Sequence, residues 1–284
     1  MRVAVVGAGT MGHGIAQVAA AAGCTVTLID TTAERAQAGL DRIRENLDGG
    51  VARGKIDGEA RDATLGRLRP TAVIEEGVRT AVLVIEAVPE RLDLKAAIFR
   101  QLDEHAPAAA VLATNTSSLS VTDLQRTTAE PARVLGLHFF NPVHINKLVE
   151  VVRGRDTSEP TLRHALSFVR MLDKEPVVVN DSPGFATSRL GVLLGLEAMR
   201  MVQEGVASAA EIDRAMELGY RHPMGPLRLT DLVGLDVRLD IARYLHEKLG
   251  AEHFRPPRLL EEMVAQGKLG RKSGEGFYRW DADG

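Results

Sequence analysis

The sequence predicts an α/β protein with a doubly wound, mainly parallel sheet, followed by a smaller all-helical domain. Up to about residue 179, short β-branched strands alternate with helical patterns, which is typical of a parallel sheet. A glycine-rich turn separates the first strand from the first helix, as in a βαβ unit. From residue 183 onward only helical patterns remain, broken by glycine and proline.

Length and composition agree with two domains of ordinary globular character. At about 150 residues per domain, a chain of 284 residues suggests two domains. We place their boundary near residue 181, so that the domains are 1–181 and 182–284. Hydrophobic residues make up 45% and charged residues 26%, and the net charge of -3 predicts no nucleic-acid partner. One cysteine, Cys24, excludes an intrachain disulfide. No targeting or membrane-spanning run is visible, so we expect a cytoplasmic protein.

The predicted elements of the first domain follow in chain order. The opening βαβ unit runs from strand Arg2–Val6 through a helix at 11–22 to strand Thr25–Ile29. A helical hairpin insertion near residues 32–68 comes next. Further strands are expected at 81–87, 109–114, 134–139, 147–152 and 176–179, and further helices at 93–104 and 160–173.

The turn after the first strand reads G-x-G-x-x-G, with glycines at positions 7, 9 and 12. Glycine there allows a tight turn, close approach of the backbone to a pyrophosphate and close packing of helix on strand. The phosphate then meets the free N–H groups at the helix start. This context predicts a Rossmann-like dinucleotide site that includes Gly7, Gly9, Thr10, Met11 and Gly12.

Asp30 ends the second strand, 18 residues after Gly12. A carboxylate there accepts hydrogen bonds from the adenosine ribose hydroxyls and repels a 2′-phosphate, which favours NAD over NADP. The alternative is that Asp30 only caps the following helix.

A histidine and a glutamate stand on two consecutive apolar strands. If the chain folds back about residue 144, His138 on the first strand faces Glu150 on the second. A carboxylate on one imidazole nitrogen fixes the tautomer and stabilises the imidazolium formed by proton abstraction. The alternative is a structural histidine.

The segment Thr114-Asn115-Thr116-Ser117-Ser118 follows another strand, at the sheet edge where ligands bind in α/β proteins. Its hydroxyls and amide suit a bound alcohol or a nicotinamide ribose. The alternative is that the segment caps the following helix.

Taken together, these motifs resemble the L-3-hydroxyacyl-CoA dehydrogenase family in its short, 3-hydroxybutyryl-CoA dehydrogenase form. The resemblance covers nearly the whole chain in order. The segments that carry it are Gly7-x-Gly-x-Met-Gly12, Glu86-Ala-Val-Pro-Glu90, Asn115-Thr-Ser-Ser118, Leu137-His-Phe-Phe-Asn-Pro142, Lys147-Leu-Val-Glu150, Ser182-Pro-Gly-Phe185, Pro223-Met-Gly-Pro226 and Leu269-Gly-Arg-Lys-Ser-Gly-Glu-Gly-Phe277.

The resemblance implies NAD as cofactor, no metal, an acyl-CoA substrate and a place in fatty acid metabolism. It implies that His138 is the general base and Glu150 its partner, and that Ser117 contacts the substrate oxygen and the nicotinamide. Near the helical hairpin, Asn46 and Arg53 fall close to family positions that touch CoA. Further NAD contacts are implied for Asp30, Glu90, Lys95, Asn115, Asn141 and Lys272.

One position departs from the family pattern Pro-Gly-Phe-x-x-Asn-Arg. Here the segment reads Pro183-Gly-Phe-Ala-Thr-Ser188-Arg189, so Ser188 stands where the family usually has asparagine. A serine can still donate a hydrogen bond at this active-site position, but it is shorter and has no amide.

The helix expected near 185–204 is apolar on most faces, so we expect it to be buried on several sides. The resemblance implies a homodimer formed through the second domain. The alternative is that this helix packs only against its own chain.

The predicted function is interconversion of L-3-hydroxyacyl-CoA and 3-oxoacyl-CoA, in which hydride leaves carbon 3 for NAD while His138 takes the hydroxyl proton. One alternative is a dehydrogenase of a free hydroxy acid, of the gulonate or carnitine type, which would not need CoA. The 3-hydroxyisobutyrate type lacks the LHFFNP segment. A non-catalytic NAD-binding protein is the alternative from another class.

Overall fold

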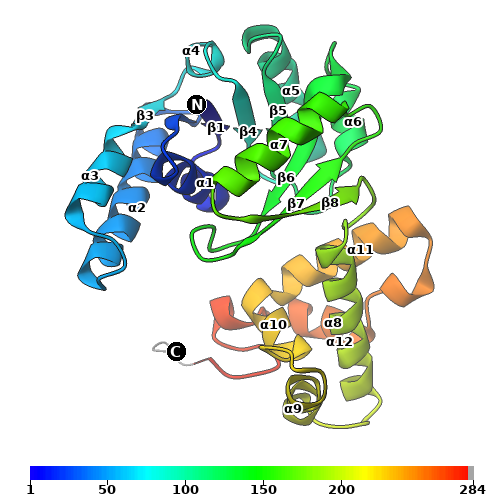
Figure 1. Ribbon diagram of the computed structural model, residues 1–284. Coiled ribbons are helices and arrows are strands. Elements are labelled where there is room, and N and C mark those ends of the chain that lie inside the picture. The colour runs from blue at the N-terminus through cyan, green and yellow to red at the C-terminus, as the bar shows by residue number, and fades with distance from the viewer. Residues whose placement is uncertain (281–284) are drawn as a thin grey trace. The chain divides into compact units, whose positions relative to one another are not determined.

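The computed structural model describes residues 1–280 of the chain. Its contacts divide the protein into two compact units, Met1–Asp181 and Ser182–Gly284. In Figure 1 the first unit runs from blue to green, and the second from yellow-green to red.

In the first unit, all of which is described, eight strands form one sheet in the order β3-β2-β1-β4-β5-β6-β7-β8. These are β1 (Arg2–Val6), β2 (Thr25–Ile29), β3 (Leu68–Thr71), β4 (Leu83–Glu86), β5 (Val111–Thr114), β6 (Val134–Phe139), β7 (Leu148–Arg153) and β8 (Glu175–Asn180). Neighbouring strands are parallel except β6 and β7, which are antiparallel. The strand order reverses at β1, and ligands bind beyond the carboxyl ends of strands at such a point.

Helices connect the strands. They are α1 (Thr10–Ala21), α2 (Ala33–Ala52), α3 (Gly58–Gly66), α4 (Ile74–Val78), α5 (Leu92–His105), α6 (Val121–Gln125) and α7 (Glu159–Met171). The first residue before α7, Ser158, accepts a hydrogen bond from the N–H of Thr161, which explains where that helix begins. The helices α2 and α3 form the predicted hairpin, which lies beside α1 at one side of the sheet (Figure 1).

Two elements of the first unit were not predicted, β3 and α4. Strand β3 reads Leu-Arg-Pro-Thr, and a proline argues against a strand because it has no N–H for the ladder. The structure places β3 at the sheet edge, where the missing N–H of Pro70 is tolerated. Helix α4 has only five residues, too few for a periodic pattern.

The second unit is helical, as predicted. It contains α8 (Thr187–Gln203), α9 (Ala209–Tyr220), α10 (Pro226–Val233), α11 (Leu235–Leu249) and α12 (Arg258–Ala265). Its own core packs residues of α8, α10 and α11 together, among them Val192, Leu196 and Leu235. Helix α8 is less buried than expected, because Leu190 keeps 66% of its surface exposed. The predicted sheet followed by a helical unit is therefore confirmed, while α8 shows one open face.

The glycine-rich segment near the end of the second unit is explained by Asp231. The carboxylate of Asp231 accepts hydrogen bonds from the N–H groups of Phe277 and Tyr278 and from Nε1 of Trp280, at 2.8 to 2.9 Å. An ideal Cβ at Gly276 would lie 2.3 Å from that carboxylate, so only glycine fits there.

Among residues 1–280, no helix is both long and apolar enough to cross a membrane.

Candidate active site

The loop between β1 and α1 uses glycine for three different reasons. Gly7 has a φ of 100°, and an ideal Cβ there would lie 2.6 Å from the carbonyl oxygen of Ala87. A Cβ at Gly12 would lie 1.7 Å from the carbonyl oxygen of Gly7, so the helix approaches the turn only with glycine. At Gly9, apart from its chain neighbours, no described atom lies within 4 Å of an ideal Cβ. The open side of Gly9 lets a phosphate reach the first N–H groups of α1.

Asp30 ends β2, and backbone N–H groups hold its carboxylate. Oδ2 accepts a hydrogen bond from Ala8 at 2.8 Å, and Oδ1 accepts one from Thr31 at 2.7 Å. Partial burial acts to raise the pKa of Asp30, but these hydrogen bonds outweigh it and lower the pKa, so the carboxylate is charged at neutral pH. The capping alternative is wrong, because Thr32 caps α2 by accepting a hydrogen bond from the N–H of Arg35.

A cavity of about 760 Å³ connects the glycine loop with Asp30. Five predicted cofactor residues line it: Gly7, Gly9, Thr10, Met11 and Asp30. Two arginines that the sequence analysis did not assign, Arg35 and Arg42, also line it, and Nη2 of Arg42 donates to the carbonyl oxygen of Ala8 at 2.7 Å. The open glycine turn and the anionic Asp30 fit the pyrophosphate and ribose of a dinucleotide.

His138 and Glu150 face each other on β6 and β7, which confirms the predicted register. Nδ1 of His138 and Oε2 of Glu150 are 2.8 Å apart. Glu150 has no exposed surface, and His138 keeps 7% of its own. The ring of Phe140 packs on the imidazole, with the ring centroids 4.3 Å apart. Because Glu150 engages Nδ1, a proton exchanged with a bound ligand would pass through Nε2.

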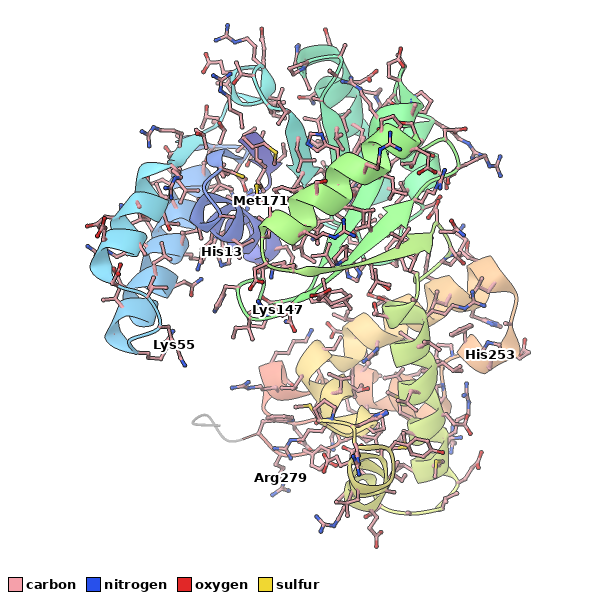
Figure 2. The ribbon with its side chains drawn as sticks, in the orientation of Figure 1. His13, Lys55, Lys147, Met171, His253 and Arg279 are labelled. Atoms are coloured by element: carbon pink, nitrogen blue, oxygen red, sulfur yellow. The ribbon has the colours of Figure 1, made fainter. Side chains whose placement is uncertain are left out.

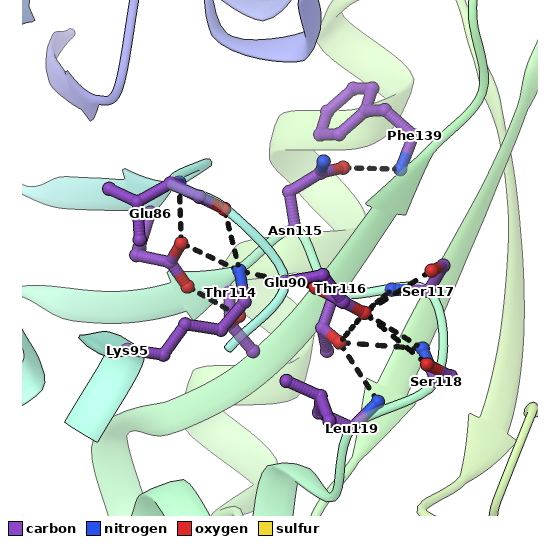
Figure 3. A network of polar contacts seen from close by, with 11 residues as sticks. Glu86, Glu90, Lys95, Thr114, Asn115, Thr116, Ser117, Ser118, Leu119 and Phe139 are labelled. Carbon is purple, nitrogen blue, oxygen red and sulfur yellow. Dashed lines mark hydrogen bonds and ion pairs between the residues drawn. The ribbon is translucent and has the colours of Figure 1, made fainter. Parts of the chain in front are cut away.

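Glu90 organises the loop that follows β5 (Figure 3). Its Oε1 accepts hydrogen bonds from the hydroxyl of Thr116 at 2.6 Å, from the N–H of Ser117 at 2.9 Å and from the hydroxyl of Ser117 at 3.2 Å. Burial acts to raise the pKa of Glu90, but Lys95 and these hydrogen bonds lower it. The loop does not cap the next helix, because the N-cap of α6 is Ser120.

Lys95 supports Glu90 from inside the unit (Figure 3). Its side chain is fully buried, with Nζ 2.7 Å from Oε1 of Glu86 and 3.4 Å from Oε2 of Glu90. Glu86 also accepts a hydrogen bond from the hydroxyl of Thr114 at 2.7 Å. Burial raises the pKa of Glu86, and the Lys95 ammonium opposes that effect. The buried ammonium thus holds Glu86 and Glu90 in place, and a direct contact of Lys95 with NAD stays a prediction.

Two asparagines stand at the strand end that carries His138. Oδ1 of Asn115 accepts a hydrogen bond from the N–H of Phe139 at 2.9 Å, which ties the end of β5 to β6. Asn141 follows β6 and is exposed. Since β5 and β6 are parallel, both amides lie at the same sheet edge as Ser117.

Asn46 and Arg53 line a second cavity of the first unit, of about 620 Å³. It is bounded by α1, by the α2–α3 hairpin and by residues between β6 and β7. Nδ2 of Asn46 donates to Oε1 of Gln17 at 3.4 Å. Lys55, at the tip of the hairpin in Figure 2, adds a second cation beside Arg53. The cavity therefore offers hydrogen-bonding and positively charged groups suited to an anionic ligand.

Ser188 and Lys272 belong to the second unit. Ser188 lies in the first turn of α8, and within residues 1–280 its hydroxyl has no hydrogen-bond partner. Nζ of Lys272 lies 2.5 Å from both carboxylate oxygens of Asp236. Their contacts with substrate and cofactor stay predictions.

The structure gives roles to two carboxylates that were not predicted from the sequence, Glu86 and Asp181. Asp181 accepts hydrogen bonds from the N–H groups of Val121 and Thr122 at 3.2 and 2.8 Å, at the start of α6. The sequence does indicate a buried partner for Glu86, because a carboxylate at the end of an apolar strand needs one, as Glu150 does.

Comparison with known proteins gives matches along the whole chain. Residues 2–182 match the family model described as the NAD binding domain of 3-hydroxyacyl-CoA dehydrogenase, and residues 184–280 match that of its C-terminal domain. The chain is 43% identical to the probable 3-hydroxybutyryl-CoA dehydrogenase of Bacillus subtilis. The alignment covers 99% of this chain and 97% of the relative.

Two further relatives are informative. The 3-hydroxyadipyl-CoA dehydrogenase of Escherichia coli is 43% identical over 99% of this chain and 59% of its own length. Among solved structures, FadB2 of Mycobacterium tuberculosis is 44% identical and superimposes with a TM-score of 0.95. The alignment covers 99% of this chain and 99% of FadB2.

Proposed function

This chain belongs to the 3-hydroxyacyl-CoA dehydrogenase family, and we propose how its own residues carry out that family's reaction. The protein is an oxidoreductase that interconverts an L-3-hydroxyacyl-CoA and the 3-oxoacyl-CoA. The full-length similarity to 3-hydroxybutyryl-CoA dehydrogenases supports this function over a free hydroxy-acid dehydrogenase or a non-catalytic NAD-binding protein.

The buried pair of His138 and Glu150 is the observation that carries the mechanism. In the oxidative direction, Nε2 of His138 takes the proton of the substrate 3-hydroxyl as a general base. Glu150, 2.8 Å from Nδ1, stabilises the imidazolium and keeps the ring oriented. The N–H of Ser117 keeps its hydrogen bond to Glu90, and the hydroxyl turns away from Glu90 to donate to the substrate oxygen. NAD, when bound, supplies the hydride acceptor for carbon 3.

The proposed cofactor is NAD, held in the cavity between the glycine loop and Asp30. The N–H groups at the start of α1 would receive the pyrophosphate beside Gly9, and the Asp30 carboxylate would accept the ribose hydroxyls. The amides of Asn115 and Asn141 are available at the carboxyl edge of the sheet for the nicotinamide half.

The proposed substrate is the CoA thioester of a short 3-hydroxy acid. Relatives are named for the 3-hydroxybutyryl group and for the 3-hydroxyadipyl group, which ends in a second carboxylate. For the CoA moiety we propose the second cavity, where Arg53 and Lys55 would pair with phosphate groups and Asn46 would hydrogen-bond.

We also propose a homodimer formed through the second unit, located in the cytoplasm. Large apolar side chains of that unit are exposed and gain from burial against a second copy. The most exposed of them are Leu190, Val206, Leu218 and Tyr220. Light scattering after gel filtration tests the dimer, and cell fractionation tests the compartment.

The test of the function is NADH formation from 3-hydroxybutyryl-CoA, compared with free 3-hydroxybutyrate, with NAD and with NADP. The proposal expects turnover only with the thioester and a strong preference for NAD. Equal activity with the free acid would overturn the assignment of a CoA substrate.

A further inference from the structure

The second cavity of the first unit has several basic side chains on its walls. Arg53 and Lys55, from the connection between α2 and α3, line it, and so does His144, from the connection between β6 and β7. Among the described residues that line it, Asp173 is the one carboxylate, and it already pairs with Lys147. The walls therefore carry an excess of basic groups, which suits a ligand with several negative charges.

Lys174 places a further positive charge behind the loop that carries His144. Its Nζ donates hydrogen bonds to the carbonyl oxygens of Val143 and Asn146, each at 2.5 Å. Lys174 keeps only 6% of its surface, and within residues 1–280 no carboxylate forms an ion pair with it. The ammonium is thus satisfied by hydrogen bonds, while its charge acts on the loop that surrounds it.

Packing fixes the backbone of this loop. Val143 keeps 2% of its surface and packs on α1, where an ideal Cβ at Gly14 would lie 2.9 Å from Cγ2 of Val143. The N–H of Asn146 donates to the carbonyl oxygen of Pro142 at 3.0 Å, which closes a turn around His144. The backbone on both sides of His144 is therefore held, and its side chain is kept at the cavity wall.

The imidazole of His144 is exposed, and among residues 1–280 it has neither a hydrogen bond nor an ion pair. Partial burial lowers its pKa, and the positive charges of Lys174, Arg53 and His13 lower it further. Because the ordinary value is about 6.5, the imidazole is mainly neutral at pH 7 while the cavity holds no anion. A bound anion acts in the opposite direction and favours the protonated form.

We propose that His144 binds a phosphate group of CoA and takes up a proton from solvent as it does so. This rests on the proposed function, which places the CoA moiety in this cavity. The imidazolium then pairs with a phosphate beside Arg53 and Lys55. The phosphate is either the 3′-phosphate of the CoA ribose or the pyrophosphate, since both are anionic. Affinity falls as pH rises, because the pairing is present below the pKa that His144 has in the complex and is lost above it.

Titration calorimetry of the full chain with butyryl-CoA measures both the Kd and the protons taken up, the latter by comparing buffers of different ionisation enthalpy. Butyryl-CoA has no 3-hydroxyl, so it cannot react and offers no proton to His138. Above pH 7 a phosphate monoester is already doubly charged, because its second pKa is about 6. We expect net proton uptake at pH 7 and a Kd about threefold weaker at pH 8.5 than at pH 7, as for one exposed ion pair.

His144→Gln tests the residue itself. Glutamine can donate a hydrogen bond but cannot become charged, and the variant should fold because the side chain is exposed. Its Kd for butyryl-CoA at pH 7 should be about three- to fivefold weaker, with neither proton uptake nor pH dependence. His144→Lys stays charged to pH 8.5 and should restore the affinity without the pH dependence. The matched control is His164→Gln, on α7 and outside the cavity lining, which should bind as the wild type does.

Two analogues identify the phosphate. Butyryl-dephospho-CoA lacks the 3′-phosphate, so loss of proton uptake with this compound assigns His144 to that group. Proton uptake that persists with it assigns His144 to the pyrophosphate. S-butyryl-pantetheine has neither phosphate and should bind without proton uptake.

The outcomes separate this inference from the proposed function. If the wild type turns over 3-hydroxybutyryl-CoA but binds butyryl-CoA without proton uptake, the role of His144 is wrong and the proposed function stands. The same conclusion follows if His144→Gln takes up as many protons as the wild type, or if proton uptake persists with S-butyryl-pantetheine. If butyryl-CoA does not bind and 3-hydroxybutyryl-CoA is not turned over, the proposed function is contradicted, and this inference with it.

Discussion

Replacing Glu150 by glutamine removes one charge from the buried pair and changes little else. Glutamine has the same shape as glutamate, so the packing between β6 and β7 is retained. A hydrogen bond to a charged group contributes about 1.5–3 kcal/mol and a neutral one about 1 kcal/mol. The imidazolium that forms on His138 in the transition state therefore loses about 1–2 kcal/mol, which corresponds to about a 5- to 30-fold fall in kcat.

A second effect of Glu150→Gln adds to the first. The glutamine amide can turn its NH2 group toward Nδ1 of His138, which places the ring proton on Nε2 and prevents that atom from accepting the substrate proton. The fall in kcat can then approach the 10²–10⁴-fold range expected, to order of magnitude, for loss of a general base. Because Glu150 has no exposed surface, KM for the substrate and Kd for NAD should change little.

Steady-state NADH formation with 3-hydroxybutyryl-CoA measures both constants. The matched control is Glu159→Gln, which removes an equal charge from an exposed ion pair with Arg153 on β7 and should leave kcat unchanged. If Glu150→Gln kept the wild-type kcat while His138→Gln was inactive, the carboxylate would not act on the histidine, and the mechanism derived from their 2.8 Å contact would be wrong.

The remaining predictions concern cofactor choice, the loop after β5 and the family departure. Asp30→Ser should raise kcat/KM with NADP relative to NAD, because a fixed negative charge is removed beside Arg35; an unchanged ratio would contradict the role of the carboxylate. Glu86→Gln should lower the melting temperature, because it leaves the buried ammonium of Lys95 without its close counter-charge; thermal unfolding measures this, and an unchanged melting temperature would show the pair to be dispensable. Ser188→Asn should change kcat/KM by about tenfold or less and shift preference among acyl chains more than NAD affinity. A large change in NAD affinity with an unchanged preference among acyl chains would contradict the prediction that Ser188 acts on the substrate.

The sequence predicts those parts of the fold and site that depend on local patterns. The alternation of strands and helices identifies the sheet, and the turn about residue 144 places His138 opposite Glu150, because strand register follows from the turn. Gly7 and Gly12 are recognisable for a similar local reason, since the close backbone approaches of one βαβ unit require them, and Gly9 and Asp30 stand at characteristic positions of the same unit.

What the sequence does not show depends on contacts between distant segments. The strand that contains Pro70 cannot be recognised from the sequence, because proline argues against a strand. Only the sheet topology shows that β3 lies at the edge, where no neighbouring strand needs the missing N–H. The burial of Lys95 beside two glutamates results from packing, and an isolated lysine in a helix pattern is usually a solvated one.

The most direct test of the central claim compares wild-type enzyme with His138→Gln, using L-3-hydroxybutyryl-CoA and NAD, with NAD affinity measured separately by calorimetry. The mechanism predicts that the wild type forms NADH, that the variant binds NAD with the same affinity, and that its kcat falls by about 10²–10⁴-fold. A variant that retained wild-type turnover would contradict the assignment of His138 as the base.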